Sequence, residues 1–103
     1  MLNQIILVGR LVSTKMQETD EDNIKAIITL AVPRSFKNSE GIYETDFIPC
    51  VLFESVAKNT SEWCQKGDVI GIRGRIQIND NNIQIIGEKV TFLSSKKVEN
   101  ENN

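Results

Sequence analysis

Apolar side chains alternate with polar ones along most of this chain, a pattern that predicts β-strands. Five stretches rich in Ile, Leu and Val follow it: residues 2–11, 24–32, 43–53, 68–78 and 83–93. Pro33 is expected to close the second strand, because proline has no backbone N–H to donate to a strand ladder. Residues 19–23 and 37–41 are predicted loops, and residues 79–82 are typical of a tight hairpin turn.

Residues 55–66 break the alternation and place their apolar side chains at helical spacing. Ser55 is expected to cap the start of this helix, and Gly67 follows its end. The apolar stripe comprises Val56, Thr60, Trp63 and Cys64. The pattern therefore predicts that Trp63 packs in the core.

The predicted order is three strands, one helix and two strands, in a chain of 103 residues. This length allows one domain, and the order fits an all-β fold, the five-stranded barrel of the oligonucleotide-binding (OB) type, with the helix closing one end. We expect residues 1–94 to form this domain. Residues 95–103 are polar and are expected to form a disordered tail.

The first predicted strand is apolar on both faces. One face carries Ile5, Leu7 and Leu11, and the other carries Leu2, Ile6 and Val8. A strand of this kind needs cover on both sides, and in a small barrel the core covers only one. The second face predicts contact with another subunit, and hence a homo-oligomer, either a dimer or a tetramer.

Composition excludes most enzyme classes. The chain has no histidine, so Ser–His and Cys–His chemistry are absent, and no metal-ligand spacing is found. Cys50 and Cys64 lie fourteen residues apart, fit no redox motif and are expected to be buried and reduced. We therefore expect no enzymatic activity, no small-molecule substrate, no metal and no cofactor.

The charge and hydropathy of the chain bear on its binding partners and its location in the cell. The formal net charge is −2, and acidic residues gather at Glu18 and residues 20–22, which is read as a solvated loop. A net negative charge is unusual for a nucleic-acid-binding protein, although a binding groove needs only local positive charge. No apolar run approaches the length of about 18 residues that a membrane helix needs. With no secretory signal pattern at the N-terminus, we expect a cytoplasmic protein without membrane contact.

Candidate binding chemistry begins with the third strand. Its even positions, including Cys50 and Leu52, form a core face, so Phe47 and Phe53 project from the opposite face. A nucleic-acid base that stacks on an exposed aromatic ring gains about 1–3 kcal/mol. The alternative is that these two rings pack at a subunit interface or beneath a loop.

Phe36 follows the second strand and is flanked by Arg34 and Lys37. An aromatic ring between two cations can stack on a base while the cations contact phosphates. The alternative interpretation is that Phe36 is a hydrophobic anchor of its loop.

The fourth strand is two-faced. Its inward positions are Ile70, Ile72, Ile76 and Ile78, and its outward positions are Arg73, Arg75 and Gln77. The two arginines form a local basic stripe, which Arg10 at the end of the first predicted strand and Lys15 beyond it extend. A merely solvated polar face is the alternative interpretation.

Four segments together resemble the bacterial single-stranded-DNA-binding (SSB) protein family. The first two are Asn3-x-Ile5-x-Leu7-Val8-Gly9-Arg10-Leu11 and Thr29-Leu30-Ala31-Val32-x-Arg34-x-Phe36-Lys37. The others are Thr45-Asp46-Phe47-Ile48-x-Cys50-Val51-x-Phe53 and Lys66-Gly67-Asp68-x-Ile70-x-Ile72-x-Gly74-Arg75-Ile76. They occur in the order of the family, over residues 1–93.

The resemblance implies an OB fold, a homo-oligomer (commonly a tetramer) and sequence-tolerant binding of single-stranded DNA. The base-stacking aromatics of the family fall on Phe36, Phe47 and Phe53. Its phosphate contacts fall on Arg34, Lys37, Arg73 and Arg75.

The chain departs from the family in two places. The last hairpin is cut to residues 77–84 and holds no aromatic or cationic residue, and residues 99–103 show no acidic tip with Pro-Phe. We therefore expect no tip-mediated recruitment of replication enzymes, and a specialised paralogue in replication, recombination or mobile-element transfer. The alternative function is a primosomal-type OB module that binds other proteins and binds DNA weakly.

Overall fold

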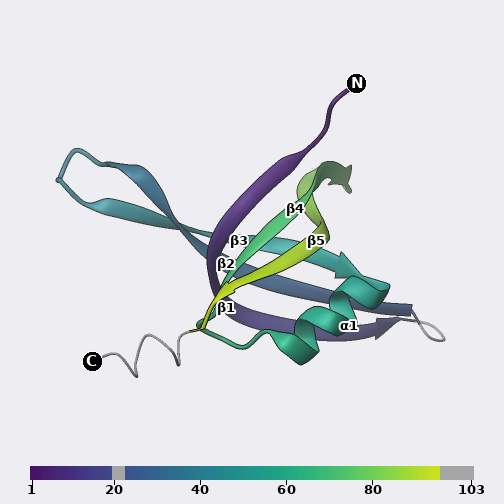
Figure 1. Cartoon of the computed structure of the whole chain (residues 1–103). Coiled ribbons are helices and arrows are strands. Elements are labelled where there is room, and N and C mark those ends of the chain that lie inside the picture. The colour runs from purple at the N-terminus through teal and green to yellow at the C-terminus, as the bar shows by residue number, and fades with distance from the viewer. Residues whose placement is uncertain (20–22, 96–103) are drawn as a thin grey trace.

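A computed structural model describes residues 1–19 and 23–95 of this chain (Figure 1). Its elements, in chain order, are β1 (Ile5–Thr19), β2 (Asn23–Lys37), β3 (Tyr43–Phe53), α1 (Glu54–Trp63), β4 (Val69–Asn79) and β5 (Asn82–Ser94). The acidic segment 20–22 and residues 96–103 of the predicted tail lie outside the described residues. Within the described part of the chain, no helix is long and apolar enough to cross a membrane.

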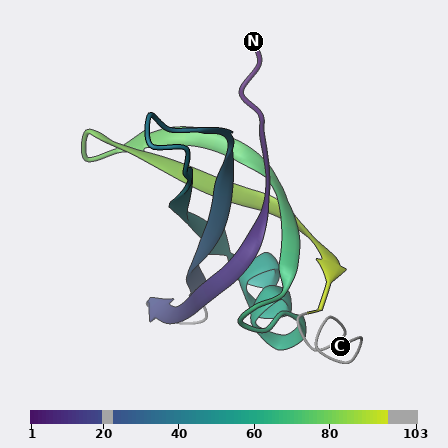
Figure 2. The ribbon, with the colours of Figure 1, turned by 90° about the vertical axis from the view of Figure 1, so that its left-hand side faces the viewer.

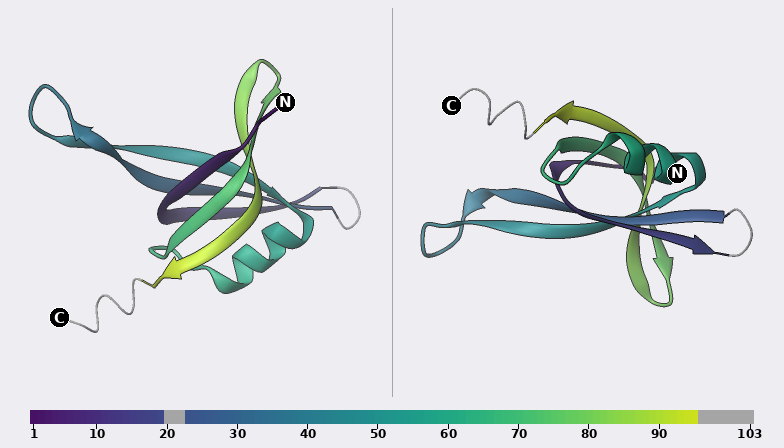
Figure 3. Two further views of the ribbon diagram at one scale, coloured as in Figure 1. Left: turned by 45° about the horizontal axis from the view of Figure 1, so that its top comes forward. Right: turned by 90° about the horizontal axis from the view of Figure 1, so that it is seen from below.

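The five strands form a closed barrel in the order β1-β2-β3-β5-β4. All neighbours are antiparallel except β3 and β5, which meet in a short parallel pair at Cys50–Ile85 and Val51–Ile86. Helix α1 lies against one end of the barrel, where it packs on β2, β3 and β5 (Figures 1 and 3). The predicted five-stranded barrel with one helix is therefore confirmed.

The core follows from the alternation along each strand. In β2 every second side chain from Ala26 to Leu30 is buried, and in β3 Cys50 and Leu52 face inward. The largest fully buried side chains are Leu11, Ile28, Leu30, Leu52, Ile70 and Ile72. Each contributes about 1.5–3 kcal/mol through burial, and the inward positions predicted at Leu11, Leu52, Ile70 and Ile72 are confirmed.

Two strands run further than the sequence pattern predicts. Pro33 does not end β2: it pairs with Thr45 of β3, and the strand continues to Lys37. The ladder is irregular between Pro33 and Lys37, and such a bulge accommodates a residue that cannot donate a hydrogen bond. Strand β1 likewise extends to Thr19, so β1, β2 and β3 build long arms beyond the barrel (Figure 1).

The helix differs from its prediction at both ends. It begins at Glu54, directly after β3, and Phe53 occupies the cap position without a side-chain hydrogen bond, so the cap expected at Ser55 is wrong. Trp63 ends the helix and is 77% exposed, so its predicted core position is wrong too. The buried stripe is the narrower one formed by Ala57, Thr60 and Cys64, and Trp63 lies beside it.

The β4–β5 hairpin has the predicted tight turn. Asp80 and Asn81 have φ of 50° and 65°, the left-handed geometry that such turns require. Ile76 and Ile78, however, are exposed, so their predicted core positions are wrong: Ile76 lies opposite Ile85, where the β3–β5 pairing ends, and Ile78 lies beyond it in the hairpin. Figure 2 shows this hairpin projecting beyond the barrel, at the end away from α1.

Candidate nucleic-acid interface

Two phenylalanines stand on the outer face of β3. Phe47 is 63% exposed and Phe53 is 43% exposed, and both project away from the buried side chains of Cys50 and Leu52. Phe47 lies opposite Ala31 of β2, which in turn lies opposite Arg10 of β1. The small side chain of Ala31 therefore leaves open space beside the Phe47 ring.

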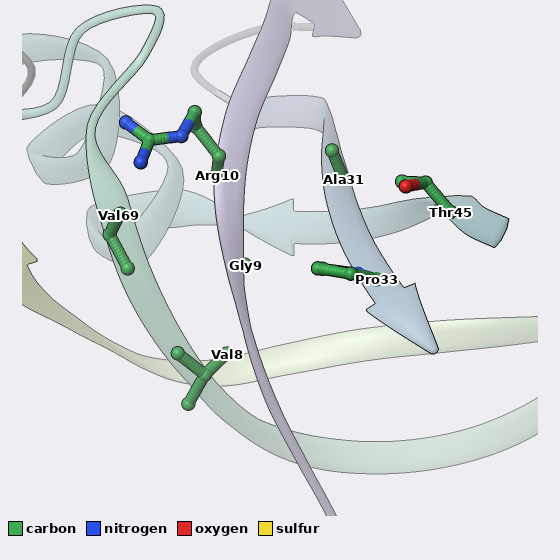
Figure 4. Close-up of a pocket in the computed structure, with 7 residues that line it drawn as sticks. All are labelled: Val8, Gly9, Arg10, Ala31, Pro33, Thr45 and Val69. Carbon is green, nitrogen blue, oxygen red and sulfur yellow. The ribbon is translucent and has the colours of Figure 1, made fainter. Parts of the chain in front are cut away.

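A hollow of about 350 Å³ lies next to Ala31 (Figure 4). Its lining residues are Val8, Gly9, Arg10, Ala31, Pro33, Thr45 and Val69. Gly9 is required there, since a Cβ atom would lie 2.7 Å from the carbonyl oxygen of Ala31. The hollow is mainly apolar and adjoins Phe47 through Ala31, so the outer face offers a ring and a recess side by side.

Arg10 borders the hollow but is directed towards the turn that follows α1. Its Nη1 donates a hydrogen bond of 2.6 Å to the carbonyl oxygen of Gly67, and Figure 4 shows the side chain on the β4 side of the hollow, away from Pro33 and Thr45. The structure therefore places this predicted cation beside the aromatic face and not over it.

Arg34 is held by two carboxylates. Its Nε and Nη2 donate to the two carboxylate oxygens of Asp46 at 3.0 and 2.9 Å, and Nη1 lies 3.3 Å from Glu44. The hydrogen bond from Arg34 lowers the pKa of Asp46, and the same bond raises the pKa of Arg34. Two carboxylates therefore surround the single positive charge of Arg34.

Phe36 and Lys37 lie at the end of β2. Phe36 is exposed, and it lies next to Lys37 in an extended segment, where neighbouring side chains project to opposite sides. Lys37 lies over the ring of Tyr43, with Nζ 5.7 Å from the ring centroid. The hairpin therefore directs these two predicted residues to different sides of the arm.

The arginines of β4 differ in their surroundings. Arg75 donates to Glu88 and to Gln77, both at 3.0 Å, and lies opposite Ile86, which pairs with Val51 of β3. Arg73 is exposed and pairs with Ile6 of β1 and Lys89 of β5. Arg75 is therefore nearer than Arg73 to the outer face of β3 that carries Phe47 and Phe53, but it is paired with Glu88.

Most of the chain matches a known family. The Single-strand binding protein family matches residues 2–99. The chain belongs to this family. Its SSB relatives are binding proteins and not enzymes, so the predicted family and the predicted lack of enzymatic activity are both confirmed.

Relatives and solved structures agree with this membership. The chain is 38% identical to single-stranded DNA-binding protein B of Bacillus subtilis (strain 168), over 93% of this chain and 94% of that protein. It is 34% identical to single-stranded DNA-binding protein 3 of Streptococcus agalactiae, over 100% of this chain and 82% of the relative.

A deletion mutant of the single-stranded DNA binding protein from Thermus aquaticus superposes with a TM-score of 0.73 at 21% identity, covering 92% of this chain and 52% of that one. The SSB domain of a Synechococcus protein gives a TM-score of 0.70 at 18% identity, covering 88% of this chain and 96% of that one. At these identities the likeness supports the OB fold.

Two further residues of the SSB barrel lie beside the candidate rings and were not predicted from the sequence. Lys25 of β2 lies directly opposite Phe53, which places a cation next to the second ring. Tyr43 lies on the same alternation of β3 as Phe47 and Phe53. The alternation along the third strand is enough to predict that Tyr43 shares the face of Phe47. The position of Lys25 follows only from the pairing register of β2 with β3.

Proposed function

We propose that this chain binds single-stranded DNA by stacking bases on Phe47 and Phe53. The observation that carries the proposal is the exposure of both rings on one face of β3 in an SSB-family barrel. Every base has a π-face, and each stacked base contributes about 1–3 kcal/mol. Binding of this kind tolerates any sequence, and Phe36 supplies a third ring on the hairpin arm.

Phosphate contacts come from the cations around these rings. The residues assigned to this role are Arg10, Arg34, Lys37, Arg73 and Arg75, together with Lys25. Each phosphate contact releases a counterion, so the affinity falls as salt rises. Because Arg34 and Arg75 are already paired with acids, we expect a shallower salt dependence than this number of cations suggests.

A second copy of the chain is proposed to cover the outer face of β1. Ile6 and Val8 are exposed there, although their neighbours Ile5 and Leu7 pack against the core. Two such apolar faces would bury each other in a dimer or in a tetramer. Residues 1–94 are proposed as the binding domain, and the short β4–β5 hairpin supports a specialised role in replication, recombination or mobile-element transfer.

The test is a titration of fluorescently labelled oligo-dT followed by anisotropy at low salt. Phe47→Ala and Phe53→Ala should each weaken binding roughly fivefold to a hundredfold. Phe92→Ala is the matched control, because Phe92 is also exposed but lies on β5 beside Trp63 of α1. No binding at micromolar protein, or equal losses in all three variants, would refute the proposed site.

The acidic partners of Arg34 and Arg75 favour one second candidate, an OB module that mainly binds other proteins. This function predicts weak oligo-dT binding together with a stable complex with a helicase, a helicase loader or another SSB protein. Co-purification with one of these partners, combined with oligo-dT binding weaker than micromolar, would favour the module over the single-strand binder.

A further inference from the structure

Tyr43 is an exposed aromatic residue at the start of β3. It is 56% exposed, and it shares the alternation of Phe47 and Phe53 along the strand. Thr45, between Tyr43 and Phe47 on the same side, lines the hollow beside Phe47. Tyr43 therefore lies on the same outer face of β3 as the rings of Phe47 and Phe53.

The Tyr43 ring has a defined setting. Lys37 lies directly opposite Tyr43 in the ladder, and its ammonium group lies over one face of the ring. A cation at this distance is attracted to the ring, and it leaves the other face for a base. The same ammonium group is then close to the phosphates that follow the stacked base.

The hairpin tip next to Tyr43 is organised by one side chain. The Oδ1 atom of Asn38 accepts hydrogen bonds from the backbone N–H groups of Glu40 and Ile42, at 2.8 and 3.0 Å. Its Nδ2 donates to Glu44 at 3.1 Å. The tip is thus preorganised, and a ring held in this way loses less conformational entropy when a ligand binds.

We propose that Tyr43 is a fourth base-stacking residue, which extends the single-strand site along the β2–β3 arm. The proposal rests on the proposed function and adds to its reach. A strand rises about 3.3 Å per residue, so Phe47 and Phe53 span about 20 Å and Tyr43 extends the ladder to about 33 Å. The arm is then part of the binding path, which passes the hollow at Thr45.

Tyr43 can report on its own stacking. It is the single tyrosine of the chain, and Trp63 is the single tryptophan. In a Trp63→Phe variant, tyrosine emission therefore comes from position 43 alone. Saturating oligo-dT should quench this emission, while anisotropy of a labelled oligo-dT measures binding independently.

Affinity for oligo-dT of graded length provides the second measurement. Tyr43→Ala should weaken binding about tenfold for oligonucleotides long enough to reach the arm, and should leave short ones unaffected. Tyr43→Phe keeps the ring and should keep the affinity. Ile42→Ala is the matched control, since Ile42 is the adjacent exposed apolar residue and carries no aromatic ring.

The possible outcomes separate the two proposals. Normal oligo-dT binding with unchanged tyrosine emission would overturn the role of Tyr43 and leave the proposed function intact. Equal affinities of the wild type and Tyr43→Ala at every length would do the same. Absence of any anisotropy change in the unmodified protein would overturn the proposed function and this proposal with it.

Discussion

Arg34 of β2 and Asp46 of β3 form a two-pronged ion pair, with donor–acceptor distances of 3.0 and 2.9 Å. Asp46 immediately precedes Phe47 in an extended strand, so the ion pair and the Phe47 ring lie on opposite sides of β3. Both side chains are partly exposed, and exposed ion pairs are weak and screened by salt. A DNA phosphate can therefore compete with Asp46 for this guanidinium group.

Asp46→Asn should strengthen single-strand binding. The change removes a negative charge one residue from Phe47 and replaces one of the two carboxylate oxygens that accept from Arg34, so the guanidinium group is more available to phosphate. We expect a severalfold lower Kd for oligo-dT, and a salt dependence steeper by about one counterion. Glu40→Gln, on the exposed tip of the same arm, changes the net charge equally without contacting Arg34. Equal gains in both variants would show that net charge alone, and not the release of Arg34, is responsible.

The same pair predicts a pH dependence. The hydrogen bond from Arg34 lowers the pKa of Asp46 below its ordinary value of 3.8. A lowered carboxyl pKa stabilises the fold above the ordinary pKa, and this contribution is lost as the pH falls through the lowered value. An NMR titration of the Asp46 carboxyl group should give a midpoint below 3.8, and Arg34→Gln should raise it. An unchanged midpoint in Arg34→Gln would contradict this origin of the shift.

The two thiols should be unreactive in the folded protein. Burial raises the pKa of Cys50 to about 11, and burial, with the nearby charge of Asp68, raises the pKa of Cys64. Since the thiolate is the reactive form, a thiol reagent at pH 8 should modify both residues slowly in the native state. Denaturant should make both react rapidly. Fast modification of Cys50 in the native protein would show that the barrel opens locally around β3.

The sequence predicted those features that depend on local alternation. Strand β3 has its predicted bounds, and Cys50 and Leu52 are buried as its even positions required. The predictions that were wrong concern where an element lies relative to the barrel. Trp63 is exposed because it lies beside the narrow stripe of α1 that packs on the barrel. Ile78 is exposed because the β4–β5 hairpin extends past the last residue pair between β3 and β5.

The candidate site could be predicted to the same extent. The outward direction of Phe47 and Phe53 follows from alternation within one strand. The position of Lys25 opposite Phe53 and the pairing of Arg34 with Asp46 both depend on the register of β2 with β3. Neither pair produces a pattern in the local sequence, so only the structure shows which charges lie beside the rings and which are paired.

Glu54 joins β3 to α1 with a φ of 53°, in the left-handed region that favours glycine. At an ordinary helix position alanine is more stable than glycine by about 1 kcal/mol. At Glu54 this order should reverse, because alanine retains a Cβ atom that makes the left-handed conformation unfavourable by about 1–2 kcal/mol. We expect Glu54→Gly to be more stable to urea than Glu54→Ala. Comparing these two variants removes the effect of losing the carboxylate, which both share.

Glu62 provides the matched pair. It is an exposed residue of the same helix, and its φ is not positive. Glu62→Ala should therefore be more stable than Glu62→Gly, by about 1 kcal/mol. If alanine were preferred at both positions, the left-handed geometry at the β3–α1 junction would not be a source of strain. If glycine were more stable than alanine at Glu54 only, the β3–α1 junction would be held against the local preference of the backbone. This junction fixes where α1 closes the barrel next to Phe53.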